Sequence, residues 1–350
     1  MTGYRRNRTT RSHRADRVGE HWRRTGLLLL LPDLMVTGAW PRLWQRLQAV
    51  EPRIVAVTAI ALTPATMAAI YAGSPIKPHN RSRPATSLGW RLGSLDMSVP
   101  LVLRAGHDVD LTELLDRWKG PSGYGLRGAG DLRQVWPSAN RCVSLVHSPD
   151  SRELLLRDVA VLFGEQVVRR LDSGEEIPAM SADSVSQLRM YRPMADEPHP
   201  YDIALRTLVR GMALLGYDAR LDTLPQRQVY ERQIARILAF RQQLTASLAA
   251  GHTVPDQTFP LVVGELERVR RALPLQPPRA WADAAAQWQD RLLRARRGAL
   301  VAVLQGLTDP VRWSETAAEE VIDVFAGNGL AMEPWERHLL GTALAFGPHG

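Results

Sequence analysis

The residue of this chain best suited to chemistry is His147, which follows a short apolar run from Val143 to Val146. The next residues are Ser148, Pro149 and an acid, Asp150, which is the pattern of a helix N-terminus capped by Ser148. This predicts a strand-to-helix junction, where backbone N–H groups and the helix dipole favour a bound phosphate. Since neutral imidazole is a good nucleophile near pH 7, the position indicates phosphoryl chemistry. The alternative is an ordinary polar histidine at a strand end.

Several strands and helices must hold this histidine in place. Beyond it, leucine and valine recur at helical spacing up to Leu162, which predicts a helix. Apolar runs bounded by turn residues predict strands upstream, and amphipathic runs between them predict helices opened by Thr63-Pro64 and by Asp110. The predicted strands are 26–31, 53–62 and 97–103, and the predicted helices are 39–50, 64–71 and 111–118.

The histidine segment resembles the active-site segment of nucleoside diphosphate kinases. The matching residues run from His147 through Ser148 and Pro149 to Asp150-Ser151. A predicted helix follows, and the interval from His147 to Phe163 also fits the family. The order of predicted elements from Thr25 to Glu165 resembles the same family. The resemblance implies an α+β domain of the ferredoxin-like βαββαβ type. It also implies that His147 takes the γ-phosphate of a Mg²⁺-bound nucleoside triphosphate and passes it to a nucleoside diphosphate or a related acceptor.

The resemblance also implies roles for residues near the histidine. The family orients its histidine with a glutamate on the following helix, and the matching position here is Asp158, which we expect to act with His147. Tyr71 falls where the family has a tyrosine near the histidine, although a tyrosine that packs a helix against the sheet is an equally good interpretation. Ser144 and Asp150 match polar positions of the family and are expected to contact the substrate.

Arginines are expected to hold the transferred phosphate. Arg127 has the Arg-Gly context of the family's phosphate arginine, and Arg133 has nearly the family's distance to the histidine, so both stay open. Arg117 lies one residue away from the position where the family has a second phosphate arginine. The lysines of the chain are Lys77 and Lys119, so we expect arginine forks rather than a lysine at the phosphate.

This chain departs from the family pattern at two positions that would take part in phosphate transfer. The first strand of the family ends in Lys-Pro-Asp, whereas this chain has Leu31 before Pro32 and Asp33. Pro149 stands where the family has a hydroxyl. The alternative function is therefore a degraded kinase-like domain that binds nucleotides or acts as a regulatory or scaffold protein.

Composition narrows the class of protein. The 350 residues carry a formal net charge of +8, which indicates anionic partners such as nucleotides or nucleic acid. The single cysteine, Cys142, excludes an internal disulfide and a cysteine-based zinc site and fits a reducing cytoplasm. The apolar run 27–31 is too short to span a bilayer and precedes no cleavage signal. We therefore expect a cytoplasmic protein without membrane contact.

The chain divides into four expected parts. Residues 1–24 form a basic tail, expected to be disordered, which could bind nucleic acid, although a solvated tail is the more ordinary interpretation. The kinase-like domain takes residues 25–165, a linker with a short helix at 184–190 takes 166–200, and an all-α domain takes 201–350.

The C-terminal part shows helical periodicity but no motif of catalytic type. Six helices are predicted, the fifth capped by Thr316 with Glu319 as its partner. Members of the family often form oligomers, so a homo-oligomer is a further expectation, left open because the helical part could block it. The six predicted helices are 201–215, 225–250, 261–273, 280–305, 316–325 and 333–345.

Overall fold

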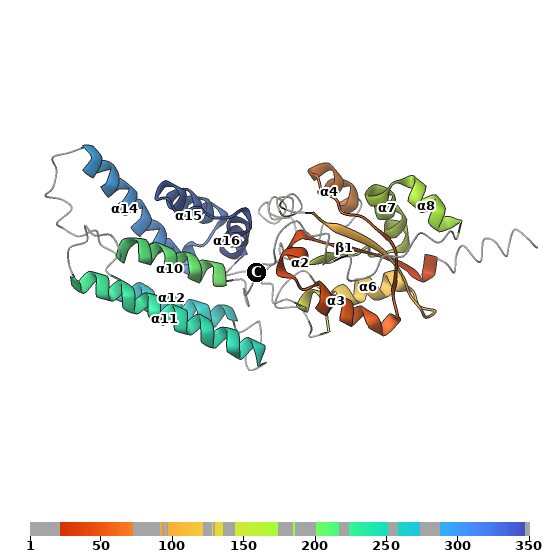
Figure 1. The fold of residues 1–350 in the computed structure, drawn as a ribbon, viewed down its shortest axis with the longest axis horizontal. Coiled ribbons are helices and arrows are strands. Elements are labelled where there is room, and N and C mark those ends of the chain that lie inside the picture. The colour runs from red at the N-terminus through yellow and green to blue at the C-terminus, as the bar shows by residue number, and fades with distance from the viewer. Residues whose placement is uncertain are drawn as a thin grey trace, which may run out of the picture.

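The computed structural model shows an N-terminal lobe built on a β-sheet and a C-terminal lobe of helices (Figure 1). Among the helices it describes, none has both the length and the apolar character needed to cross a membrane. The described residues are 22–72, 92, 95, 97–121, 128, 130–135, 144–173, 185, 201–216, 224–250, 258–273 and 288–346.

The N-terminal lobe is organised around β1 (Thr25–Leu30), which lies inside a four-stranded sheet ordered β2-β3-β1-β4. The other strands are β2 (Arg53–Val57), β3 (Val99–Arg104) and β4 (Val146–His147). Every neighbouring pair is antiparallel. In this register His147 lies opposite Leu29 of β1, so the central strand positions the histidine directly.

All six residues of β1 are buried, because both faces of the sheet are covered. Leu28 and Leu30 belong to one hydrophobic cluster, and Leu27 and Leu29 belong to another. This alternation follows from the two-residue period of a strand, whose successive side chains point to opposite faces. The continuous leucine run is therefore a strand buried on both sides, at the position where the sequence predicted a strand.

Helices cover both faces of the sheet (Figure 1). The first cluster contains Leu43 of α3 and Leu115 of α6, and a Cβ at Gly26 would come within 2.7 Å of Leu115, so α6 packs closely on β1. The second cluster contains Ile70 of α4 and Leu155 of α7. The bounds are α3 (Trp40–Leu47), α4 (Pro64–Tyr71), α6 (Leu111–Lys119) and α7 (Arg152–Phe163).

Two predicted helix caps are confirmed. The Thr63 hydroxyl accepts a hydrogen bond from the backbone N–H of Thr66 at the start of α4. The Asp110 carboxylate accepts one from the N–H of Glu113 at the start of α6. Both satisfy an N–H group that the first turn of a helix leaves without an intrahelical partner.

The prediction that Ser148 caps the helix after His147 is wrong. The helix α7 begins at Arg152, and its cap is Ser151, whose hydroxyl accepts from the N–H of Leu154. Ser148 is fully buried, and its carbonyl accepts a hydrogen bond from the Lys119 ammonium group, so it belongs to the packed end of β4. His147 therefore lies in a strand followed by a short turn rather than at the helix N-terminus itself.

The segment predicted as a linker begins instead with a helix, α8 (Glu165–Asp172). Its residues Val167, Val168 and Leu171 pack against the second hydrophobic cluster, because they recur at helical spacing on one face. Residues 174–184 and 186–200 lie outside the described ranges, as do residues 1–21 of the basic tail. The rest of the linker and its short helix therefore stay predictions.

The elements described from residue 202 onward are helical, near the predicted positions. The predicted cap of the fifth helix is wrong, because Ser314 rather than Thr316 accepts from the N–H of Ala317. Trp335 of the last helix joins the second cluster of the N-terminal lobe, so the lobes are in contact. The helices are α10 (Asp202–Gly216), α11 (Leu224–Ala249), α12 (Thr258–Ala272), α14 (Trp288–Leu307), α15 (Glu315–Gly327) and α16 (Pro334–Phe346).

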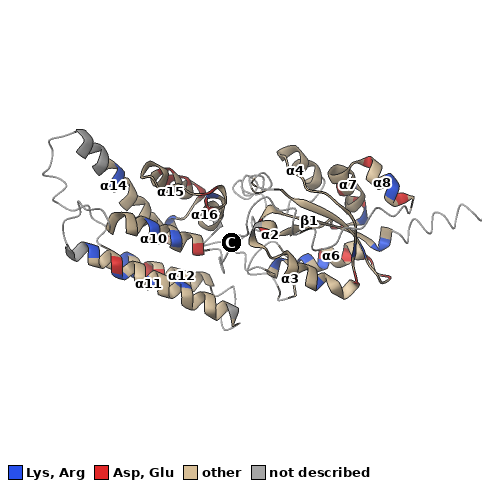
Figure 2. Cartoon of the chain, in the orientation of Figure 1, with Lys and Arg blue, Asp and Glu red and all other residues tan. Residues whose placement is uncertain are grey.

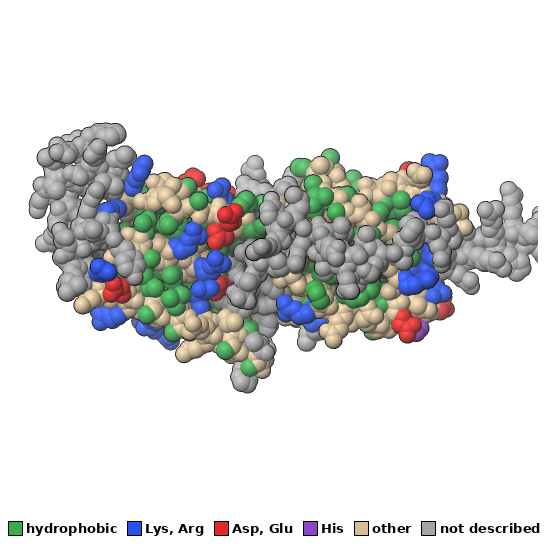
Figure 3. Space-filling view, in the orientation of Figure 1, with side chains coloured by type: hydrophobic (Ala, Val, Ile, Leu, Met, Phe, Trp, Pro, Cys, Tyr) green, Lys and Arg blue, Asp and Glu red, His purple; other side chains and the backbone are tan. Residues whose placement is uncertain are grey.

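Arginines of the helical lobe bind its buried carboxylates. Arg241 forms two hydrogen bonds of 2.6 Å to Asp202, whose side chain is 1% exposed. Glu265, whose side chain is 3% exposed, bonds to Arg236 and Arg268. Basic and acidic side chains accordingly lie beside one another on α10, α11 and α12 (Figures 2 and 3). At Asp202 and Glu265, arginine therefore neutralises acids that packing has removed from water.

The start of β4 is held by Asp33, in the first turn of α2 (Pro32–Thr37). One carboxylate oxygen of Asp33 accepts from the N–H of Leu34 at 2.9 Å, and the other accepts from the N–H of Leu145 at 2.8 Å. Leu145 has φ of +63°, in the left-handed region that a leucine rarely adopts. The buried carboxylate thus fixes a strained residue just before the candidate nucleophile.

Replacing Asp33 by Asn should lower the free energy of unfolding by about 1–3 kcal/mol, because the amide NH₂ would face an N–H donor that the carboxylate now satisfies. Urea unfolding followed by circular dichroism measures this. The matched control is Asp108→Asn, whose side chain is 74% exposed, and it should change stability by less than about 0.5 kcal/mol. Equal stabilities of the two variants would contradict the role of Asp33.

Candidate active site

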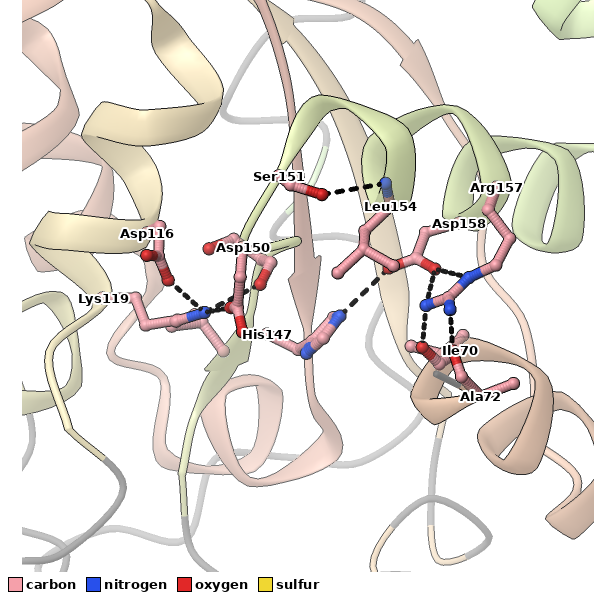
Figure 4. A network of polar contacts seen from close by, with 12 residues as sticks. Ile70, Ala72, Asp116, Lys119, His147, Asp150, Ser151, Leu154, Arg157 and Asp158 are labelled. Carbon is pink, nitrogen blue, oxygen red and sulfur yellow. Dashed lines mark hydrogen bonds and ion pairs between the residues drawn. The ribbon is translucent and has the colours of Figure 1, made fainter. Parts of the chain in front are cut away.

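His147 is enclosed at the end of β4 and faces the first turns of α7 (Figure 4). Only 8% of the residue is exposed. Its Nε2 lies 3.3 Å from Oδ2 of Asp158, the residue that the sequence placed on the following helix. The structure thus brings together the two residues predicted to be catalytic.

The contact with Asp158 decides the protonation of the imidazole ring. Asp158 is fully buried and its carboxylate accepts hydrogen bonds, so Nε2 of His147 carries the proton. Nδ1 then holds a lone pair, and no described residue forms a hydrogen bond with it. The ring therefore has the tautomer that a nucleophile at Nδ1 requires.

Burial lowers the pKa of His147 below its ordinary value, because the charged imidazolium would lose its hydration. The hydrogen bond and the negative charge of Asp158 act in the opposite direction, and the positive charges of Lys119 and Arg133 lower the pKa further. The net effect keeps His147 neutral at pH 7, which preserves the nucleophilic lone pair.

Tyr71, at the C-terminal end of α4, packs its ring edge-on against the imidazole of His147. The ring centroids are 5.2 Å apart, with an angle of 66° between the planes. Tyr71 is 44% exposed, so it contacts both the histidine and the solvent. The structure therefore places it beside the histidine, as the resemblance implied.

A lysine that the sequence analysis did not assign to the site lies next to the histidine. Lys119, the last residue of α6, donates to the carbonyl of Ser148 at 2.8 Å and to the carboxylates of Asp150 at 2.5 Å and Asp116 at 2.7 Å (Figure 4). Its side chain is 11% exposed. The expectation of a site served by arginine without lysine is therefore wrong. The sequence contained one indication of this residue, because Lys119 is one of the chain's two lysines and lies at the end of a predicted helix.

Asp150 is bound to this lysine rather than lying free at a helix N-terminus. Partial burial would raise the pKa of Asp150, but the hydrogen bond and charge of Lys119 outweigh it and hold that pKa below its ordinary value. Asp150 is therefore ionised at pH 7, and Lys119 is paired with the carboxylates of both Asp150 and Asp116.

Arg133 braces the backbone around the histidine. Its guanidinium donates to the carbonyls of Gly120 at 2.6 Å, Ser144 at 3.2 Å and Val146 at 3.2 Å. Burial lowers the pKa of Arg133, although an arginine stays charged at neutral pH. A guanidinium has five N–H donors, so two remain beyond these three contacts. Ser144, a predicted contact residue, takes part here through its carbonyl.

Of the predicted phosphate arginines, the structure describes Arg117 and Arg133 but not Arg127. Arg117 lies on the outer face of α6, where its side chain is 67% exposed and pairs with Glu113. Arg127 lies outside the described residues. Leu31, which replaces the lysine of the family pattern, is buried in the second hydrophobic cluster. The positive charge near His147 therefore comes, within the described part of the chain, from Lys119, Arg133 and Arg157.

No cluster of three or more histidine, cysteine or acidic residues suited to a metal ion occurs among the described residues. Asp116 and Asp150, the carboxylates that flank Lys119, are both engaged by it. Magnesium in phosphoryl-transfer sites is held by one or two carboxylates together with the phosphates of the substrate. Among the described residues, these two carboxylates are already paired with a cation of the protein.

Comparisons with known proteins give limited matches. No family model matches the chain, and no curated protein sequence does. Among solved structures, 85 chains match. One is the nucleoside diphosphate kinase of Aquifex aeolicus, at 20% identity, a TM-score of 0.34, and coverage of 41% of this chain and 96% of the other.

A second solved structure is that of the Halobacterium salinarum nucleoside diphosphate kinase in complex with CDP. It matches at 14% identity with a TM-score of 0.35, over 47% of this chain and 97% of the other. The NDP kinase of Pyrobaculum aerophilum matches at 17% identity with a TM-score of 0.33, over 41% and 98%. These scores do not establish a shared fold, so the function is inferred from the side chains of the site.

The titration of His147 tests the electrostatics of this site. The imidazole should titrate below about 6.5, the ordinary value for histidine. In Asp158→Asn it should titrate lower still, because the carboxylate that favours the imidazolium is gone. Nuclear magnetic resonance of ¹⁵N-labelled histidine measures both, with the signal assigned by its loss in His147→Gln. An unchanged or higher pKa in Asp158→Asn would contradict the assigned contact.

Proposed function

We propose that this chain is a nucleoside diphosphate kinase-like phosphotransferase that works through phospho-His147. The observation that carries the proposal is the buried hydrogen bond from Nε2 of His147 to Asp158, which leaves the lone pair on Nδ1 near the positive charges of Lys119 and Arg133. The sheet order β2-β3-β1-β4, all antiparallel, is the order that a ferredoxin-like βαββαβ domain has, which supports the same proposal.

In the proposed first step, the lone pair of Nδ1 of His147 attacks the γ-phosphorus of a nucleoside triphosphate. The Nδ1–P bond forms, the bond from phosphorus to the bridging β,γ-oxygen breaks, and the nucleoside diphosphate leaves with that electron pair. The ring becomes cationic, with its proton still on Nε2, and Asp158 stabilises the charge. The reverse reaction with a second nucleoside diphosphate, or a related acceptor, returns the neutral ring.

The proposed site also needs cations that stabilise the charge spreading over the phosphoryl oxygens. Lys119 is the best placed of these, because it is fixed by three oxygen partners beside the histidine and could exchange one of them for a phosphate oxygen. Arg133 adds its two remaining N–H donors. Mg²⁺ would be held chiefly by the nucleotide phosphates, where it neutralises their charge.

Two observations favour the second candidate, a kinase-like module that binds nucleotides without transferring phosphate. Leu31 is buried in apolar surroundings at the position of the family's strand-end lysine, and Lys119 is engaged by two carboxylates. Such a module would bind nucleoside tri- and diphosphates but form no phosphohistidine. A homo-oligomer stays a prediction under either candidate.

Incubation with γ-³²P-labelled ATP and Mg²⁺ separates the two candidates. The phosphotransferase should acquire an acid-labile, alkali-stable label, which chases onto added nucleoside diphosphate and is absent from His147→Gln. If wild type remains unlabelled while it binds nucleotide in a filter assay, the binding module is correct. If His147→Gln labels as well as wild type, His147 is not the carrier.

Replacing Lys119 by Met should slow the formation of the label by about 10²-fold, because the site loses one preorganised cation. Single-turnover labelling of a preparation shown to be folded by circular dichroism measures this. Arg42→Met, on the exposed side of α3, is the matched control and should label at the wild-type rate. A wild-type rate in Lys119→Met would mean that Lys119 only holds Ser148 and Asp150 in place.

A further inference from the structure

Arg157 precedes Asp158 on α7 and binds the same carboxylate as the candidate nucleophile (Figure 4). Its Nε and Nη2 donate to Oδ1 of Asp158 at 3.0 and 2.7 Å, while Oδ2 faces Nε2 of His147 at 3.3 Å. The two oxygens of one buried carboxylate are thus divided between a guanidinium and an imidazole. With one oxygen held by the arginine, the carboxylate cannot rotate freely against the histidine.

The other side of the same guanidinium reaches the end of α4. Nη1 of Arg157 donates to the carbonyl of Ala72, and Nη2 donates to the carbonyl of Ile70. The last carbonyls of a helix have no intrahelical N–H partner, so a side-chain donor there stabilises the terminus. Tyr71 lies between these two residues and packs its ring on His147.

We propose that Arg157 is a positioning residue. Its single guanidinium fixes the relative positions of the two protein partners of the His147 ring, which are the Asp158 carboxylate and the Tyr71 side chain. Its consequence for phosphate transfer rests on the proposed function, whereas the contacts themselves do not. Arg157 touches neither the ring nor the expected path of the phosphate, so its action on the chemistry is indirect.

The proposal requires an arginine rather than any cation. The planar fork of a guanidinium can bind a carboxylate with one edge and carbonyl oxygens with another, whereas an ammonium group is a single point of charge. Arg157 is 28% exposed and Asp158 is fully buried, so the fork is only partly hydrated. A lysine could therefore keep the charge beside Asp158 but not both carbonyls of the α4 terminus.

Three variants separate charge from geometry. Arg157→Gln removes the cation and most of the fork, Arg157→Lys keeps the cation alone, and Arg169→Gln, on the exposed face of α8, is the matched control. The readouts are the ¹⁵N titration and tautomer of His147, the ring-current shift that Tyr71 exerts on its imidazole protons, and the rate of labelling by γ-³²P ATP. Within the described part of the chain, the charged or titratable groups near His147 are Asp158 and Arg157 of α7, Lys119 of α6, Arg133, Asp150 and Tyr71 of α4.

In Arg157→Gln we expect the pKa of His147 to rise, because the charge of Asp158 is no longer shared with an arginine. We also expect labelling to slow by about 10²-fold, because the ring is misplaced. In Arg157→Lys the titration should stay near that of wild type, while the Tyr71 ring-current shift is lost and labelling slows by about 10-fold. Arg169→Gln should match wild type in all three measurements.

The proposal is overturned if Arg157→Gln is less stable but keeps the His147 titration, tautomer and ring-current shift of wild type, because Arg157 would then serve only folding. If Arg157→Gln does not fold, Arg157→Lys decides, and retention of the Tyr71 shift at the wild-type labelling rate overturns the proposal. Absence of label on wild type refutes the proposed function alone, because the resonance measurements still test Arg157 without any phosphate transfer.

Discussion

The structure of the candidate site depends on one constraint, the complete burial of the Asp158 carboxylate. An ionised carboxylate removed from water is stable only when hydrogen bonds and opposite charge replace its hydration. His147 binds one of its oxygens, and Arg157 binds the other. The same requirement therefore sets the tautomer of the histidine, places the arginine, and through that arginine ties the end of α4, with Tyr71, to α7.

A second group of contacts surrounds the other side of the histidine. Lys119 at the end of α6 and Arg133 each bind backbone carbonyls next to His147, at Ser148 and at Val146. These buried cations satisfy carbonyls that the very short strand β4 leaves without partners in the sheet. Their charge also opposes protonation of the imidazole. Holding the strand end in place and keeping the histidine neutral are thus two effects of the same side chains.

Local sequence patterns predicted most of the described elements. The leucine run of β1, the caps at Thr63 and Asp110, and the helical spacing after Ser151 depend on neighbouring residues, so they can be recognised without a fold. The errors have a common origin. Ser148 is a residue type that often caps helices, but packing buries it. The segment of α8 is polar on average, as a linker would be, yet its valines lie on one face and pack against the core.

The sequence by itself indicated the candidate nucleophile, and its resemblance to the kinase segment implied Asp158 as the partner. Because the two residues are only 11 positions apart, a turn and the start of one helix are enough to bring them together. Only the tertiary structure decided which cations join them. Lys119 and Ser148 are 29 positions apart, and Arg157 and Ala72 are 85 apart. No local pattern can encode such contacts, since they form when sheet packing brings the ends of α6 and α4 to β4 and α7 and buries charges that must then find partners.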